Sequence, residues 1–234
     1  MDTIRLISNE YGDTPLVESY RTLRSNLQYR CNAENRKILC VTSATTGEGV
    51  SEVAANLAIS LSKNNDKVLL IDGNLRNPVQ HVVFDVKNQG LTNHIIMDED
   101  LTIHRHVMPH LDLITSGVAV ESPSEVVDSH RLSTVFEYIR DEYDVIIVDT
   151  PSVLSVTDAL VIAEKADGVL LVVKDLPYCV IRSCLKNTGP SLSSFIHTAN
   201  HRNIGLSTTN RMAATKRSNT DLIIKSRCLD AKMS

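Results

Sequence analysis

The chain has 234 residues, 42% of them hydrophobic and 22% charged, with 24 Lys and Arg against 28 Asp and Glu and a formal net charge of −4. This length and balance predict one large folded domain, or one domain with a tail, and exclude wholesale disorder. No apolar run approaches the roughly 18 residues of a membrane span, and the first residues lack the basic and apolar pattern of a secretory signal. We therefore expect a soluble protein of the reducing cytoplasm.

The first part of the chain predicts a helical arm over residues 1–35, because apolar side chains recur there at helical spacing. The side chains with this spacing are Tyr20, Leu23 and Leu27. A continuous apolar run over 37–42 then predicts a strand covered on both faces. After a glycine-containing turn, helical spacing resumes over 50–64.

A second buried strand over 67–71 ends at Asp72 and completes a βαβ unit, for which we expect parallel strands and a right-handed crossover. The alternation then continues. Further expected elements are strands at 111–117, 144–151 and 168–173 and a helix over 123–143. This pattern predicts an α/β domain over residues 36–175 with a doubly wound, mainly parallel sheet.

The cysteines and histidines do not predict a metal site. The five cysteines are widely scattered and form no CxxC pair, so we interpret them as buried or incidental thiols. His104, His106 and His110 lie close together, but no acidic or thiol partner stands at ligand spacing. We expect a solvated loop there.

The composition changes near Asp175. Residues 1–175 carry a net charge of −11, whereas 176–234 have 9 Lys and Arg against 2 Asp and contain no Glu. Helical and strand periodicity also fade, although 179–187 predicts a turn or two of helix and the segment near Leu222 is strand-like. We expect a weakly structured tail without a specific nucleic-acid partner, since its basic residues are dispersed.

Three features between and at the ends of the buried strands predict a site for a nucleotide and a metal ion. Gly47 and Gly49 lie between a strand and a helix N-terminus, where backbone N–H groups and the helix dipole favour a phosphate. Asp72 and Asp149 each end an apolar strand at the carboxyl edge, where open α/β sheets bind ligands. Two carboxylates that converge there favour Mg²⁺ between them.

These motifs resemble those of a known family. Residues 15–173 are similar to the cytoplasmic kinase domain of the bacterial tyrosine kinases of capsule and exopolysaccharide synthesis, relatives of the MinD/ParA ATPases. VTSATTGEGVS resembles their phosphate-binding (Walker A) motif, VLLIDGNLRNP their acidic second motif, and DVIIVDTPSV their Walker B strand. ESYRTLRSN is similar to the helix through which such kinases are expected to pack into rings.

The resemblance implies a P-loop NTPase-like fold, an ATP and Mg²⁺ cofactor, and a role for each matching residue. The residues that would contact the nucleotide are Thr46, Gly47, Glu48, Gly49, Val50 and Ser51. Ser51, Asp72 and Asp149 would hold the metal, the two aspartates would activate the incoming tyrosine hydroxyl, and Arg76 would stand near them. The resemblance also implies homo-oligomers through Glu18, Arg21 and Arg24, and a membrane adaptor that completes the site at the inner face of the membrane.

The chain departs from the family pattern at two positions of this site. Val50 occupies the position of the lysine that neutralises phosphate charge, and loss of one such donor typically costs roughly 10²- to 10³-fold in rate. Asn74 stands where the second motif has an acidic residue, so Asp72 would act without it. We therefore expect nucleotide binding with impaired phosphoryl transfer.

By resemblance the function is that of an autophosphorylating, ATP-dependent protein tyrosine kinase that regulates polysaccharide synthesis. The alternatives are a nucleotide-binding pseudokinase or assembly subunit and, less favoured, a partition-type ATPase. The family also has a further helix, a strand and a tyrosine cluster at the C-terminus, whereas only Tyr178 follows Tyr143 here. We interpret segment 176–234 as the product of a shifted reading frame, with a newly evolved domain as the alternative.

Overall fold

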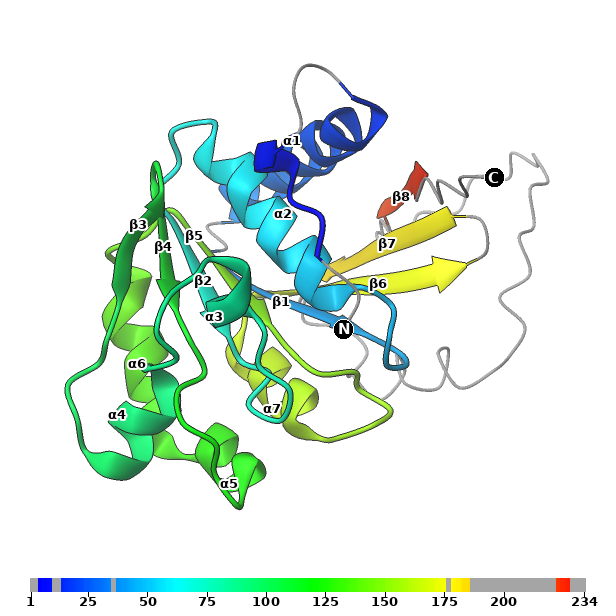
Figure 1. The fold of residues 1–234 in the computed structure, drawn as a ribbon. Helices are drawn as coiled ribbons and strands as arrows, with labels where there is room; N and C mark the ends of the chain where they lie inside the picture. Colours follow the sequence, from blue (N-terminus) through cyan, green and yellow to red (C-terminus); the bar gives the residue numbers. More distant parts are fainter. Residues whose placement is uncertain (1–3, 10–13, 35–36, 176–177, 186–221, 228–234) are drawn as a thin grey trace, which may run out of the picture.

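The computed structural model describes residues 4–9, 14–34, 37–175, 178–185 and 222–227, which form a three-layer α/β arrangement around one sheet (Figure 1). Within these residues the sheet has eight strands in the order β3-β4-β2-β5-β1-β6-β7-β8. Its strands are β1 (Ile38–Ser43), β2 (Val68–Asp72), β3 (His104–Met108), β4 (Leu111–Ile114), β5 (Val145–Asp149), β6 (Gly168–Asp175), β7 (Tyr178–Leu185) and β8 (Leu222–Arg227).

The five central strands, from β4 to β6, are parallel, and β3, β7 and β8 pair in antiparallel fashion at the two sides. The predicted doubly wound, mainly parallel sheet is therefore confirmed. The strands β1 and β2 of the first βαβ unit are parallel as expected, but β5 lies between them. This strand order brings the end of β5 next to both other strand ends.

The helices cover both faces of the sheet (Figure 1). They are η1 (Ile7–Asn9, a 3₁₀ turn), α1 (Pro15–Glu34), α2 (Val50–Ser62), α3 (Gln80–Val83), α4 (Leu91–Met97), α5 (Pro123–Asp128), α6 (His130–Arg140) and α7 (Asp158–Lys165). Among the described helices, none is both long and apolar enough to cross a membrane.

Alternate side chains of each central strand enter two separate hydrophobic clusters, as expected for strands covered on both faces. On β1, Leu39 and Val41 pack with α1 and α2, whereas Ile38 and Cys40 pack with the helices α4 to α7. The continuous apolar runs of the sequence reflect this double coverage.

The expected helical arm packs against the domain. Tyr20, Leu23 and Leu27, which predicted the helix, are buried in the same cluster as the apolar face of α2. The side chain of Asn56 on α2 also accepts a hydrogen bond from Ile7 N (2.8 Å) and donates one to the Arg5 carbonyl (2.8 Å). The N-terminal segments thus form one layer of the fold.

Three local predictions were wrong. The helix expected over 123–143 is interrupted at Ser129, whose extended backbone separates α5 from α6 and whose hydroxyl accepts a hydrogen bond from Leu132 N (3.3 Å). Of the histidines expected in a solvated loop, His104 and His106 lie in β3, which pairs with β4, whereas His110 is exposed in the turn that follows. Where the structure describes the segment 179–187, expected as a turn or two of helix, it is strand β7, which pairs with β6 along its length.

The tail therefore contributes two strands to one side of the sheet, and the strand-like segment near Leu222 is β8. The rest of 176–234, including most of the residues on which the prediction of weak structure depends, lies outside the described residues.

Candidate functional site

The predicted site residues come from the carboxyl ends of three adjacent parallel strands. The loop 44–49 follows β1, Asp72 ends β2 and Asp149 ends β5. In the register of β2 and β5, Asp72 pairs with Asp149. Because neighbouring parallel strands lie about 5 Å apart, the sheet itself brings the two carboxylates together beside the glycine loop.

The glycine loop has the backbone of an anion-binding turn. Gly47 and Gly49 have φ of 82° and 84°, the left-handed region that a side chain disfavours. Gly49 is also the N-cap of α2, and no side chain caps this helix end. The N–H groups of the first turn have no acceptor within the helix, so they are suited to bind a phosphate.

The other loop residues shape or border this turn. The Glu48 carboxylate accepts hydrogen bonds from Thr45 N (3.0 Å) and Thr45 Oγ1 (2.5 Å), which closes the loop on itself. Thr46 is exposed at the same turn. Val50 begins α2 and packs, half-buried, against the hydrophobic cluster beneath α1 and α2. A side chain with no donor therefore occupies the lysine position.

Both aspartates are fully buried, yet their hydrogen bonds differ. Asp72 accepts three backbone hydrogen bonds, from Asn74 N (3.2 Å) to Oδ1 and from Val79 N and Gln80 N (both 3.0 Å) to Oδ2. Asp149 Oδ2 accepts one from the Gln80 amide (2.7 Å), while its Oδ1 has no hydrogen-bond partner. The unpartnered oxygen is thus on Asp149.

The electrostatics of the pair favour a retained proton when no cation is present. Burial and the adjacent charge of Asp149 together raise the pKa of Asp72 to about 8, although its backbone donors act in the opposite direction. Burial raises the pKa of Asp149, and with the lowering effect of the Gln80 and Ser51 side chains it lies at about 6. Because the two titrations are linked, these values describe the pair.

Arg76 lies on the loop after β2, as the motif requires, and pairs with Asp158 at the start of α7. Its Nε and Nη2 atoms donate to the two carboxylate oxygens at 2.9 and 3.3 Å, and this partner raises the pKa of Arg76. The guanidinium is partly exposed, whereas Asp158 is buried. The ion pair thus connects the second motif to the helix that follows the Walker B strand.

The segment after β5 lies along the loop that follows β1. Thr150 Oγ1 donates to the Val41 carbonyl (2.8 Å), and Val153 N and Leu154 N donate to the carbonyls of Ser43 (2.9 Å) and Ala44 (3.2 Å). The segment after β5 and the start of the loop 44–49 therefore hold each other in position.

Sequence reasoning missed Gln80, which is completely buried between the two aspartates and α2. Its amide nitrogen donates to Asp149 Oδ2 (2.7 Å) and to the Ser51 carbonyl (3.1 Å). A polar residue eight positions after Asp72 was the only signal in the sequence, and no periodicity shows that it turns back into the site.

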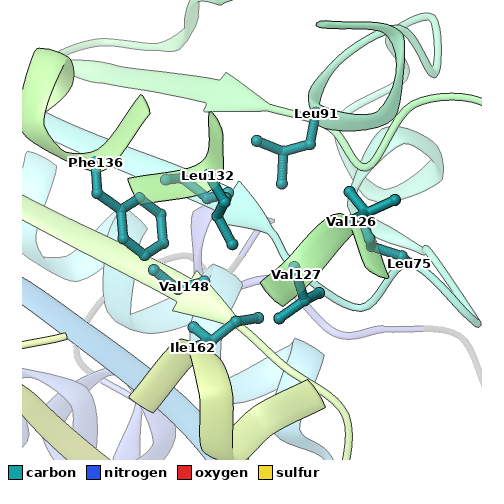
Figure 2. A pocket seen from close by; sticks show the side chains of 10 residues that line it. Leu75, Leu91, Val126, Val127, Leu132, Phe136, Val148 and Ile162 are labelled. Carbon is teal, nitrogen blue, oxygen red and sulfur yellow. The ribbon is translucent and has the colours of Figure 1, made fainter. Parts of the chain in front are cut away.

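An apolar pocket near the site belongs to the core. Figure 2 shows it between the strand residue Val148 and side chains of the covering helices, among them Phe136, Val127 and Ile162. All ten residues that line it are apolar or glycine, so it offers no polar partner to a nucleotide. The polar candidate residues lie instead at the carboxyl edge of the sheet.

Comparison with known proteins agrees with this geometry. A family model described as an AAA domain matches residues 36–188. The tyrosine-protein kinase YwqD of Bacillus subtilis is 36% identical over 159 residues, which cover 67% of each chain. The chain belongs to the bacterial tyrosine-protein kinases. The family identified from the motifs is therefore confirmed.

Relatives in this kinase family differ in length. EpsB of Ralstonia nicotianae is 34% identical over 172 residues, and the match covers 72% of this chain but only 23% of EpsB. The solved kinase domain of the Escherichia coli tyrosine kinase Etk has 31% identity and a TM-score of 0.64, covering 70% of this chain and 69% of that one. The ATPase MinD of Pyrococcus furiosus, at 24% identity and a TM-score of 0.51, shares the fold.

Proposed function

We propose that the chain is an ATP- and Mg²⁺-dependent protein tyrosine kinase of capsular or extracellular polysaccharide synthesis, with phosphoryl transfer impaired by Val50. The observation that carries this proposal is the uncapped glycine loop of α2 beside two paired, buried aspartates. Family membership supports the reaction class, and YwqD is named as a tyrosine-protein kinase.

The residues present fit a divalent cation. Asp149 Oδ1 is buried without a partner, and Ser51 at the start of α2 lies close enough to influence the pKa of Asp149. Within the described residues, no three His, Cys, Asp or Glu side chains form a metal cluster. Mg²⁺ typically binds through one or two carboxylates together with water and nucleotide phosphates, which suits this pair.

Each residue then has a defined task. The N–H groups at Gly47 and Gly49 bind the phosphate chain of ATP, and Ser51, Asp72 and Asp149 hold the cation, which would neutralise phosphate charge. A buried carboxylate with a raised pKa is a suitable base for the proton of an incoming tyrosine hydroxyl. Arg76, held by Asp158, orients the loop on which Asn74 replaces the second acidic residue.

Val50→Lys tests the proposal, with Val50→Met as a control of similar length and no charge. With Mg²⁺-ATP and a tyrosine-rich peptide, we expect weak phosphotyrosine formation by the native protein. Val50→Lys should increase the rate about 10²- to 10³-fold, since one preorganised donor is restored. If Val50→Lys binds ATP and still forms no phosphotyrosine, the protein is not a kinase.

A second candidate is a nucleotide-binding assembly subunit without catalysis. The packing of Val50 against the hydrophobic cluster favours it, because this side chain contributes to the fold and offers nothing to the phosphates. Tight ATP binding with no turnover in both Val50 variants would support this alternative. A partition-type ATPase remains the less favoured reading, since α1 carries the kinase-type Glu18, Arg21, Arg24 pattern.

We also propose that the protein forms homo-oligomers through α1 and acts beside a membrane adaptor at the inner face of the membrane. Glu18 and Arg21 form an exposed ion pair (3.3 Å), so both lie at the surface. Arg24 is partly buried and donates to the Ser60 carbonyl (2.8 Å), which fastens α1 to α2. Glu18→Ala and Arg21→Ala should therefore reduce the oligomer size in light scattering, while Arg24→Ala should also reduce stability.

For the domain division we retain the boundaries 1–35, 36–175 and 176–234 as a proposal, with the last segment derived from a shifted reading frame. The change of composition at Asp175 supports it, and the family match ends soon after, at residue 188. If neither other reading frame of the gene encodes a helix, a strand and a tyrosine run downstream, this origin is wrong.

A further inference from the structure

Gln80 connects the three parts of the candidate site. Its backbone N donates to Asp72 Oδ2 (3.0 Å), and its side-chain nitrogen donates to Asp149 Oδ2 (2.7 Å) and to the carbonyl of Ser51 (3.1 Å). The residue is completely buried. Gln80 therefore holds the ends of β2 and β5 and the start of α2 in one arrangement.

Two oxygen atoms of this arrangement have no hydrogen-bond partner. They are Oε1 of Gln80 and Oδ1 of Asp149, which belong to side chains in direct contact. A buried acceptor without a partner is unfavourable, so each of these oxygens needs an explanation. A cation would provide a partner for Asp149 Oδ1.

The orientation of the Gln80 amide is decided by its neighbours. Its nitrogen faces two acceptors, a carboxylate oxygen of Asp149 and the Ser51 carbonyl. The opposite orientation of the amide would place Oε1 against both acceptors and lose both hydrogen bonds. Gln80 must therefore present its oxygen away from them, and Asp149 must keep Oδ2 toward Gln80.

We propose that Gln80 is a positioning residue for a divalent cation: by holding Oδ2 of Asp149 it leaves Oδ1 available to the cation. The inference rests on the proposed Mg²⁺–nucleotide site. A neutral amide suits this position, since two buried carboxylates already repel each other and a third carboxylate would add to the repulsion. Partners that orient a metal-binding carboxylate commonly contribute 10- to 100-fold to metal affinity.

The test compares Gln80→Met, which keeps the side-chain length without amide hydrogen bonds, with Val82→Ala on the exposed side of the same helix. Binding of a fluorescent ATP analogue to the full chain is measured in EDTA and then across a Mg²⁺ titration. Gln80→Met should raise the Mg²⁺ concentration for half-maximal enhancement about 10- to 100-fold. Its affinity for the analogue in EDTA should match that of the native protein, and Val82→Ala should match in both measurements.

The outcomes separate this inference from the proposed function. The positioning role is refuted if Gln80→Met has an unchanged Mg²⁺ requirement, or if it loses as much affinity for the analogue in EDTA as in Mg²⁺. Either result leaves the kinase proposal intact. A selective Mg²⁺ shift combined with a silent Val50→Lys variant supports the positioning role and refutes the kinase proposal. If the native protein shows no Mg²⁺-dependent binding of the analogue, both are wrong.

Discussion

The buried pair Asp72 and Asp149 predicts an unusual dependence of stability on pH in the absence of Mg²⁺. Burial places the pKa values of both carboxyls, about 8 and about 6, above those of an unfolded chain. The folded protein therefore binds more protons than the unfolded one between about pH 4 and about pH 8. The free energy of unfolding falls as pH rises through this range. Above about pH 8 both carboxyls are deprotonated in the folded protein, so the pair no longer changes the free energy of unfolding with pH.

The size of the effect follows from the number of protons retained. One proton that the folded pair retains from about pH 4 to about pH 8 lowers the free energy of unfolding by roughly 1.4 kcal/mol for each pH unit, or on the order of 6 kcal/mol in total. With a urea m-value of about 2 kcal/mol per molar, the unfolding midpoint would move by about 3 M. Other titrating groups also contribute, so a variant must isolate the pair.

Asp149→Asn is the suitable variant, because its Oδ1 can accept the Gln80 hydrogen bond while its NH₂ group replaces the unpartnered oxygen. Urea unfolding in EDTA at pH 5 and pH 8 should show only a small difference in stability between variant and native protein at the lower pH. At the higher pH the variant should be more stable. Asp72→Asn is the matched control and should gain less, since its NH₂ group would face a backbone N–H.

The reasoning is refuted if the difference in unfolding free energy between the native protein and Asp149→Asn is the same at pH 5 and pH 8. The pair would then titrate equally in the folded and unfolded states. Saturating Mg²⁺ should reduce the difference in unfolding free energy between variant and native protein at pH 8, since a bound cation compensates the negative charge of the second aspartate.

Two further predictions concern the remainder of the domain. A Cβ atom at Gly90 would lie 1.9 Å from the Thr115 carbonyl oxygen, so Gly90→Ala should lose about 1–3 kcal/mol of unfolding free energy in urea; an unchanged midpoint would mean that the loop shifts freely. Asp112 accepts hydrogen bonds from Tyr143 (2.8 Å) and Arg105 (2.9 Å), and its hydrogen bonds outweigh the effect of burial and lower its pKa. Asp112→Asn should thus cost about 1–3 kcal/mol at neutral pH and progressively less below pH 4, where the native carboxylate also loses its charge; a constant cost across this range would contradict the assignment.

The sequence was informative where structure depends on local pattern. The apolar runs of β1, β2 and β5 are continuous because helices cover both faces of the sheet, so these strands could be predicted with nearly correct bounds. A continuous helix was expected across Ser129, however, because periodicity does not register a single residue that adopts an extended backbone.

Sequence alone determined the parallel α/β class, the glycine loop and the two aspartates at strand ends, because turn residues and apolar periodicity act over a few neighbouring positions. Only the tertiary structure decided that β5 lies between β1 and β2, that Asp72 pairs with Asp149, and that Gln80 turns back into the site. These contacts join residues far apart along the chain. Their formation depends on the packing of the whole sheet, which no local pattern encodes.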